Sequence, residues 1–270
     1  MKETRISPRH PRAESLRIRE RLVEHFNSGV VTVAGLLAQG RGEAFDYLLG
    51  EKTTPNALNA MKAATALLLA AKHPVISVNG NAAALAAKNI VRLAKQVNAK
   101  IEVNLFHRSL DREEAIEKLF KKAGATQILG VGEASSAAIP EIASDRRRVD
   151  PRGILIADVV LVPLEDGDRT EALVKMGKRV IAIDLNPLSR TAKFANVTIV
   201  DNIVRAVPSL IRIVEKLRTE DKKRLRKLVD EFDNARNLSE ATEMIEKRLE
   251  SLAQESQKGA HLTVLEEKDA

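Results

Sequence analysis

The chain has 270 residues, of which 44% are hydrophobic, enough to bury one large core or one core with a smaller helical appendage. It contains no cysteine, which excludes a disulfide framework, a thiolate metal site and a thiol nucleophile. The longest aliphatic run, around residues 63–71, is too short to cross a bilayer, and no apolar leader follows Met1. We therefore expect a cytoplasmic protein that does not insert into a membrane.

The formal net charge is +7, and basic residues cluster at 5–21, 146–148 and 222–227. Such clusters can attract nucleic acid. However, the chain has one tyrosine and no tryptophan, which leaves few aromatic side chains for base stacking. Anionic small substrates explain the positive charge at least as well, and we expect no nucleic-acid partner.

The first quarter of the chain has the apolar spacing of helices. Thr54 is typical of a helix N-cap and Pro55 of the first helical position, so the longest of these helices begins there. The predicted helices span residues 13–27, 31–39, 43–49 and 54–72.

Short apolar runs then alternate with helical stretches. Strands are predicted at 75–78, 100–105, 127–131, 158–162, 179–184 and 197–200, with helices at 82–97, 111–122 and 169–176 and an irregular region at 133–151. Strands separated by helices imply right-handed crossovers and a mostly parallel sheet covered by helices. The fold class is α/β and Rossmann-like, with a helical N-terminal segment.

The charged C-terminal part, residues 203–252, is predicted to be helical with a break near 233–234. Residues 253–270 are polar and expected to be frayed or disordered. We assign residues 1–215 to a single α/β catalytic domain and 216–270 to a helical C-terminal extension.

Polar residues follow two neighbouring predicted strands. Asp184 precedes Leu185 and Asn186, and Asp201 precedes Asn202. Acids at the carboxyl ends of parallel strands commonly meet ribose hydroxyls, and Arg190 can pair with phosphate or lie on a base. These residues predict a nucleotide site. In the alternative interpretation, Asp184 and Asn186 only stabilise the next turn.

The common phosphate-binding fingerprints are missing. No glycine-rich turn leads into Lys-Ser or Lys-Thr, and Gly130-Val131-Gly132 lacks the third glycine of a dinucleotide-binding motif. The turn at residues 163–169 is acidic where a pyrophosphate would need open amides. A dehydrogenase is therefore disfavoured.

Further candidate sites have structural alternatives. Asn79-Gly80-Asn81 joins a strand to a helix, which favours an anion but also suits a plain cap. Arg41 lies between two glycines that let the backbone approach a ligand, or that simply break a helix. Asn104, His107 and Arg108 follow a strand and could contact substrate, although His107 suits an ordinary loop position equally well.

Two charged stretches are also ambiguous. Asp166, Asp168, Arg169 and Glu171 could bind Mg²⁺ or an amine, or form a capped helix start. The residues from Ser7 to Arg21 are favoured, in isolation, to form an ordinary basic helix face.

Together these motifs resemble the archaeal-type phosphopantothenate synthetases, which are 4-phosphopantoate:beta-alanine ligases. The resemblance runs from about Ser7 to Leu210 and rests on the segments 7–12, 40–48, 78–81, 162–173 and 183–190. Residues 133–148 look variable, and the tail carries little signal.

The resemblance implies a place in coenzyme A biosynthesis, where ATP, 4-phosphopantoate and beta-alanine give 4'-phosphopantothenate, AMP and pyrophosphate through an acyl adenylate. It also implies a homodimer. Because the chain has no clustered metal ligands, we expect Mg²⁺ to arrive with a phosphate. The ATP contacts that the resemblance implies are Arg19, Arg41, Asp184, Leu185, Asn186, Arg190, Thr191, Asn202 and Ile203. Our own inference assigns phosphopantoate to Asn79, Gly80, Asn81 and Arg108, and the acids Asp166 and Asp168 to magnesium or beta-alanine. Catalytic roles are expected for Arg41, Asn81, Asp166 and Asp168.

Overall fold

The structure, a computed structural model, describes residues 6, 7 and 9–257. The described helices, in chain order, are α1 (Ala13–Asn27), α2 (Val33–Leu49), α3 (Pro55–Ala70), α4 (Gly80–Val97), α5 (Leu110–Lys122), α6 (Gly167–Lys175), α7 (Arg190–Phe194), α8 (Ile203–Leu217), α9 (Lys222–Asp230) and α10 (Asn234–Gln257). The described strands are β1 (Pro74–Val78), β2 (Lys100–Val103), β3 (Ala137–Ala138), β4 (Arg148–Val149), β5 (Val159–Pro163), β6 (Arg179–Ile183) and β7 (Val197–Ile199).

Five strands form a parallel sheet in the order β2-β1-β5-β6-β7. The predicted α/β architecture, with helices between parallel strands, is therefore confirmed. β3 and β4 form a separate antiparallel pair inside the region predicted to be irregular. A predicted strand at 127–131 is wrong, because that stretch contributes only a single bridge, between Glu102 and Leu129, to the sheet edge.

Alternate side chains of the strands face two apolar cores. Ile76, Leu161 and Ile181 belong to a core that also takes buried residues of α3, α4 and α8. Val75 and Val160 face a second core, filled by α6 and by apolar residues between 139 and 157. This alternation follows from the twofold side-chain period of a strand, and it leaves both faces of the sheet covered.

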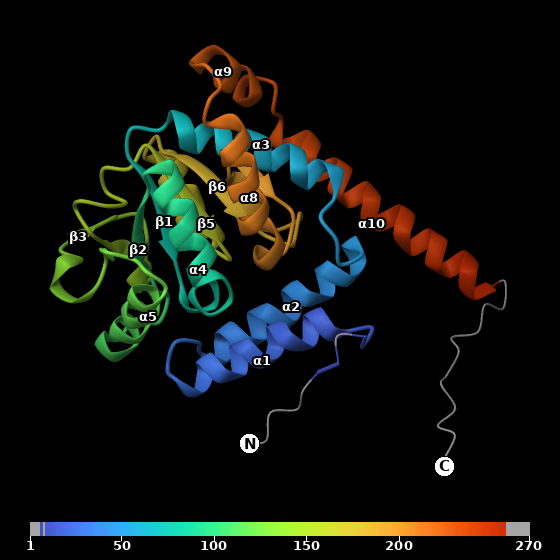
Figure 1. The fold of residues 1–270 in the computed structure, drawn as a ribbon, viewed down its shortest axis with the longest axis horizontal. Coiled ribbons are helices and arrows are strands. Elements are labelled where there is room, and N and C mark those ends of the chain that lie inside the picture. The colour runs from blue at the N-terminus through green and yellow to red at the C-terminus, as the bar shows by residue number, and fades with distance from the viewer. Residues whose placement is uncertain (1–5, 8, 258–270) are drawn as a thin grey trace.

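The N-terminal helices lie across the carboxyl ends of the strands. In Figure 1, α1 and α2 lie side by side below α4, where β1 ends and α4 begins. We expected separate helices at 31–39 and 43–49, but α2 runs without interruption from Val33 to Leu49. Gly40 and Gly42 are therefore tolerated inside the helix, because neighbouring good helix formers outweigh the entropic cost of two glycines.

The C-terminal part continues the helical pattern. A break at residues 233–234 is confirmed, and a second break separates α8 from α9. α10 extends to Gln257, so the expectation of a frayed segment is wrong for residues 253–257, and residues 258–270 lie outside the described part. Leu238 and Ala241 of α10 pack with Leu49 of α2 and Ala192 of α7. α10 thus supports two of the elements that border the site.

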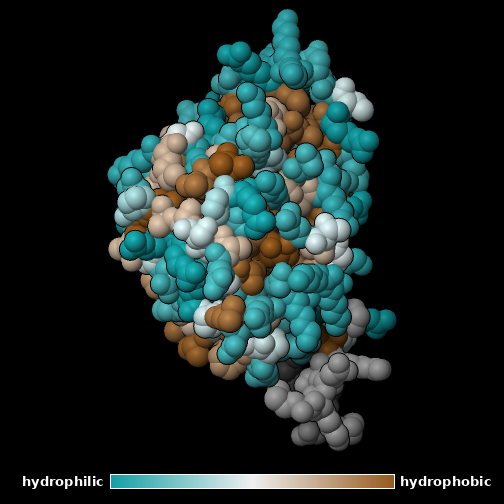
Figure 2. Space-filling view, turned by 90° about the vertical axis from the view of Figure 1, so that its left-hand side faces the viewer, coloured by the Kyte–Doolittle hydropathy of each residue, from teal (hydrophilic) through white to brown (hydrophobic). Residues whose placement is uncertain are grey.

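The surface is mostly hydrophilic. Figure 2 shows the face that carries α5 and the β3-β4 pair, where hydrophobic residues occur in small groups between polar ones. Among the described residues, no helix is both long and apolar enough to span a membrane.

Candidate active site

Two pockets lie next to each other at the carboxyl ends of the strands. The larger, named here the Asp184 pocket, has a volume of about 420 Å³, and the smaller, named the Arg146 pocket, has about 250 Å³. Both are lined by Ala38, Asn81, Leu164 and Asp166. The two pockets therefore share a wall, at the edge of a parallel sheet where small ligands usually bind.

The Asp184 pocket is built around the turn between β6 and α7. Asp184 follows β6 and accepts hydrogen bonds from the backbone N–H of Asn186 at 2.9 Å and from the Ser189 hydroxyl. Ser189 in turn caps α7 by accepting from Ala192 N–H at 2.9 Å. Asp184 thus stabilises the turn, as the structural alternative predicted, and also lines the pocket.

Burial raises the pKa of the Asp184 carboxyl, while its hydrogen bonds and the nearby Arg41 act in the opposite direction. Arg41 reaches this pocket from α2, together with Gly42 and Phe45. A Cβ added at Gly42 would meet Leu185 Cδ1 at 3.6 Å, an ordinary contact. The structure therefore places Arg41, Asp184 and Leu185 around one cavity.

Arg190 and Thr191 close the other side of the Asp184 pocket. Arg190 is largely exposed and forms ion pairs with Asp168 and Glu171, the second at 3.0 Å from Nη2 to Oε2. The Thr191 hydroxyl donates to the Glu165 carbonyl oxygen at 2.8 Å. Asp168 has a side chain that is 74% exposed and lines neither pocket, so it acts here as a partner of Arg190.

Three residues expected to contact ATP lie away from both pockets in the single chain. Arg19 of α1 makes a two-point contact with Glu43 at 2.9 and 2.8 Å. Asn202 caps α8 and donates its amide to Asp46 at 2.9 Å, and Ile203 is buried in the core. Their assignment to ATP stays a prediction.

The Arg146 pocket surrounds the N-terminus of α4. Asn79 caps this helix by accepting from Ala82 N–H at 3.0 Å, and its amide donates to the carbonyl oxygens of Pro163 and Leu164. A Cβ on Gly80 would lie 2.2 Å from the Val30 carbonyl oxygen, so only glycine fits. The N-terminus of α4 therefore lines the pocket, and its backbone N–H groups and the positive end of its dipole are available for an anion.

Asn81 and Leu164 belong to the shared wall. The Asn81 amide donates to the Gly35 carbonyl oxygen at 2.8 Å, which joins α4 to α2. Leu164 has a φ of 55°, a left-handed conformation that is strained for a residue with a γ-branched side chain. Strain of this kind is typical of positions that the surrounding structure holds in place for a ligand.

The Arg146 pocket is lined by two arginines that the sequence did not reveal as site residues. Arg112 of α5 donates to the Val30 carbonyl oxygen at 3.2 Å. Arg146 pairs with Glu165 and Asp166, both at 2.6 Å. Arg146 lies in a run of three arginines in a region predicted to be irregular, and nothing in that run indicates which one points inward.

Arg108, which we expected to bind substrate, lines neither pocket. Its side chain is 5% exposed, pairs with Glu113, and donates to the Gly130 carbonyl oxygen and the Ser135 hydroxyl at 2.7 and 2.6 Å. Arg112, four residues further on, occupies the position beside the pocket. His107 also lines the Arg146 pocket, as the strand-end pattern allowed.

The shared wall contains one carboxylate, Asp166. Burial raises the pKa of this group, and the Arg146 guanidinium opposes that effect. The described residues contain no group of three or more His, Cys, Asp or Glu side chains that could hold a metal ion. A cation at this site would therefore have to be held largely by oxygen atoms of a bound phosphate and by water.

The arrangement suits two anionic reactants that meet at a wall. One pocket offers Arg41, Arg190 and the half-buried Asp184 carboxylate, a combination that fits a phosphorylated molecule with hydroxyl groups. The other offers Arg112, Arg146 and a helix N-terminus, which together fit a phosphate or carboxylate.

A family model and individual relatives point to the same protein family. Residues 56–248 match the family model described as phosphopantothenate/pantothenate synthetase. The 4-phosphopantoate–beta-alanine ligase of Thermococcus kodakarensis is 51% identical over 93% of this chain and 95% of its own length. The protein of the same name from Methanosarcina mazei is 51% identical over 94% of this chain and 99% of its own. The chain therefore belongs to the phosphopantothenate/pantothenate synthetase family.

Proposed function

We propose that the protein is an ATP-dependent ligase of coenzyme A biosynthesis. It joins 4-phosphopantoate to beta-alanine and forms 4'-phosphopantothenate, AMP and pyrophosphate. The observation that carries this proposal is the pair of adjoining pockets with a common wall at Asn81 and Asp166. Relatives about half identical over nearly their whole length bear the name of this ligase.

In this proposal ATP occupies the Asp184 pocket. Asp184 accepts hydrogen bonds from the nucleoside, and the Asn186 amide donates to it. Arg41 and Arg190 neutralise the charge of the phosphates. Arg190 is already paired with Asp168 and Glu171, so ATP has to displace or share those contacts. Arg19, Asn202 and Ile203 stay proposed contacts that the geometry of one chain does not support directly.

The second substrate occupies the Arg146 pocket with its phosphate toward Arg112, Arg146 and the α4 N-terminus. Its carboxylate then lies at the shared wall and attacks the α-phosphorus of ATP, which expels pyrophosphate and leaves an acyl adenylate. The amine of beta-alanine next attacks the acyl carbon and expels AMP. Catalysis comes from the alignment of the reactants and from neutralisation of phosphate charge.

Asp166 and Asn81 act at the point where the two reactants meet. The amine of beta-alanine has to lose a proton before it can attack, and Asp166 is the carboxylate of the shared wall with a raised pKa. Asn81 contributes the backbone N–H at the start of α4, and its amide fixes α2 against that helix. Asp168 contributes by orienting Arg190.

Mg²⁺ belongs to the proposal as an ion that arrives with ATP. It would neutralise charge on the phosphates, and Asp166 or Asp184 could supply a single carboxylate oxygen, as in many nucleotide sites. This fits the described residues, which offer isolated carboxylates at the pockets and no cluster of ligands.

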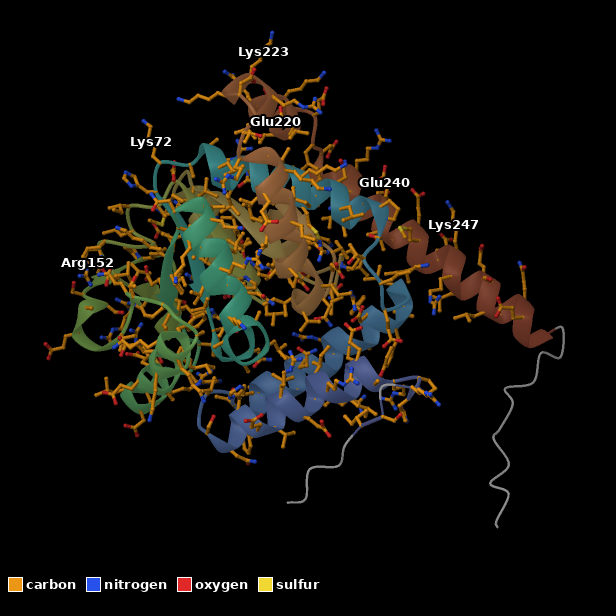
Figure 3. The ribbon with its side chains drawn as sticks, in the orientation of Figure 1. Lys72, Arg152, Glu220, Lys223, Glu240 and Lys247 are labelled. Atoms are coloured by element: carbon orange, nitrogen blue, oxygen red, sulfur yellow. The ribbon has the colours of Figure 1, made fainter. Side chains whose placement is uncertain are left out.

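The proposal also covers the localisation, the oligomeric state and the macromolecular partners of the enzyme. We propose a cytoplasmic homodimer that does not bind nucleic acid. Val33 and Leu37, one turn apart on α2, are 59% and 72% exposed, and an apolar pair of this kind is suited to a subunit contact. In Figure 3, the labelled basic side chains Lys72, Arg152, Lys223 and Lys247 point outward from separate elements, so they do not form one basic groove.

The test is a product analysis with each component omitted in turn. With ATP, Mg²⁺, 4-phosphopantoate and beta-alanine, we expect AMP, pyrophosphate and 4'-phosphopantothenate in equal amounts by mass spectrometry. Without beta-alanine the amide product should be missing. Formation of ADP would indicate a different ATP-dependent enzyme. Salt-sensitive binding of an oligonucleotide without any turnover would favour the nucleic-acid alternative.

A further inference from the structure

Asn104 follows β2 and is completely buried. The strand-end pattern made it a candidate for substrate contact, but it lines neither pocket. Its backbone N–H donates to the Val78 carbonyl oxygen at 2.9 Å, which fixes it to the end of β1, where α4 begins. Any effect of Asn104 on the reaction therefore has to pass through another residue.

The contacts of Asn104 lead to Arg146. Its amide donates to the carbonyl oxygens of Arg146 and Arg148, both at 3.1 Å. The backbone carbonyl oxygen of Asn104 accepts from Arg146 Nη1 at 3.3 Å. One buried residue thus holds both the backbone and the side chain of an arginine that lines the pocket.

Arg146 needs such support because of the segment that carries it. Between residues 132 and 154 the structure contains only two 3₁₀ turns and the two-residue strands β3 and β4. Glu165 and Asp166 hold the guanidinium from the pocket side, and they would also draw it away from a bound anion. The Asn104 amide fixes the backbone on both sides of Arg147, and the Asn104 backbone carbonyl contacts the Arg146 guanidinium, so Asn104 counteracts this pull.

We propose that Asn104 is a positioning residue that holds Arg146 in the Arg146 pocket and thereby sets the preference of the enzyme for a phosphorylated over an unphosphorylated pantoate. This inference rests on the proposed function. It concerns how the phosphate is recognised and leaves the ATP site unaffected.

Asn104→Asp tests this role most directly, because aspartate has the same size as asparagine. Its carboxylate oxygen can only accept hydrogen bonds, whereas the amide it replaces donates to the two carbonyl oxygens. We expect the KM for 4-phosphopantoate to rise about tenfold, the effect of a lost buried hydrogen bond. The KM for ATP should stay within about twofold, and any effect that passes through the ion pair of Arg146 with Asp166 should lower the kcat/KM for phosphopantoate and for pantoate, which has no phosphate, alike. The preference for the phosphorylated substrate therefore falls by about tenfold.

Asn237→Asp is the matched control. Asn237 of α10 is also buried, its amide donates to the Thr198 carbonyl oxygen at 2.9 Å, and it contacts neither pocket. A general loss of packing would affect the two variants alike. We expect Asn237→Asp to keep the wild-type preference, and an equal loss of preference in both variants would overturn the proposal.

A double-mutant cycle with Arg146→Ala decides whether Asn104 acts through Arg146. We expect Asn104→Asp to have no further effect on the preference once Arg146 is gone. An undiminished effect in that background would overturn the proposal. If Arg146→Ala alone leaves the preference unchanged, this proposal and the phosphate assignment both fail, while formation of 4'-phosphopantothenate by the wild type still supports the proposed reaction. Should Asn104→Asp not fold, Asn104→Ala, which removes the amide donor without adding a buried charge, takes its place in the same cycle with the same expected outcomes.

Discussion

The arginines at the two pockets differ in whether they already form ion pairs with carboxylates of the protein. Arg146 and Arg190 each pair with two carboxylates, whereas Arg41 forms no ion pair with any other residue that the structure describes. A free guanidinium loses no existing partner when a phosphate binds, so Arg41 should contribute most to ATP affinity and turnover.

Replacement of Arg41 by alanine should therefore lower kcat/KM for ATP by about tenfold or more, the effect of one lost charge-assisted hydrogen bond. Arg224→Ala is the control, because Arg224 is also an exposed helical arginine but lies on α9, away from both pockets. Steady-state kinetics with ATP as the varied substrate measure the difference. Equal, wild-type-like values for both variants would remove Arg41 from the site.

Among the individual site residues, the sequence revealed those that follow strand ends but not those that tertiary packing brings to the pockets. Asp184, Arg190 and Asn79 could be predicted because parallel strands place their carboxyl ends at one edge. The choice between Arg108 and Arg112 could not, because it depends on where Glu113 and the turn at Gly130 lie after folding.

Among the elements, α2 carries the largest difference between prediction and structure. The glycines that suggested a break instead lie inside a continuous helix. A Cβ at Gly40 would meet no atom within 4 Å, whereas one at Gly80 would overlap the Val30 backbone. The same residue type therefore has opposite roles: Gly40 only weakens its helix, and Gly80 permits the close approach of α4 to the loop before α2.

Gly40→Ala should accordingly stabilise the protein by about 0.5–1 kcal/mol, because alanine lowers the entropic cost of helix formation. Gly80→Ala should destabilise it by 1 kcal/mol or more, through overpacking against the backbone, on the order of known core insertions. Urea unfolding of both variants measures the two changes. Destabilisation by Gly40→Ala would show that α2 is interrupted at that position, as the sequence pattern had suggested.

The strands and helices of the sheet were largely predictable, since each has a buried apolar run and clear caps, as at Thr54 and Asn79. The stretch at 127–131 is apolar but forms a single bridge at an edge, because the positive φ of Gly130 turns the chain away. Composition alone does not show whether an apolar run will find a partner strand.

For the whole molecule, stability should depend on pH through Glu102. This carboxyl is completely buried in β2 and accepts backbone hydrogen bonds from Asp150 at 2.9 Å and Ile154 at 2.6 Å. Burial raises its pKa from 4.5 to about 7, although the hydrogen bonds oppose the change. Between these two values the folded state holds a proton that the unfolded state has lost, so stability falls as pH rises through this window.

The expected loss between pH 4.5 and 7 is up to about 3 kcal/mol from this group. Glu102→Gln mimics the protonated form and should remove that part of the pH dependence in urea unfolding at pH 5 and pH 8. Glu240→Gln, at a half-exposed position on α10 that Figure 3 labels, should leave the dependence as in the wild type. A wild-type pH dependence in Glu102→Gln would contradict the assignment.

The position of the two pockets depends on many parts of the chain at once, because α2, α4, α5 and the loops after β5 and β6 all contribute to them. The sequence indicated that an ATP site and an anion site exist, but their common wall depends on the packing of α2 against α4. Only the folded chain shows that the two pockets share a wall.

The most direct test of this arrangement is a crystal structure of the protein with 4-phosphopantoate and a non-hydrolysable ATP analogue. We predict that the substrate phosphate lies within hydrogen-bonding distance of Arg112 and Arg146, and that the nucleotide lies beside Asp184. The substrate carboxylate should face the α-phosphate between Asn81 and Asp166. Binding of both ligands in one pocket, or of the substrate phosphate away from Arg112 and Arg146, would contradict the account.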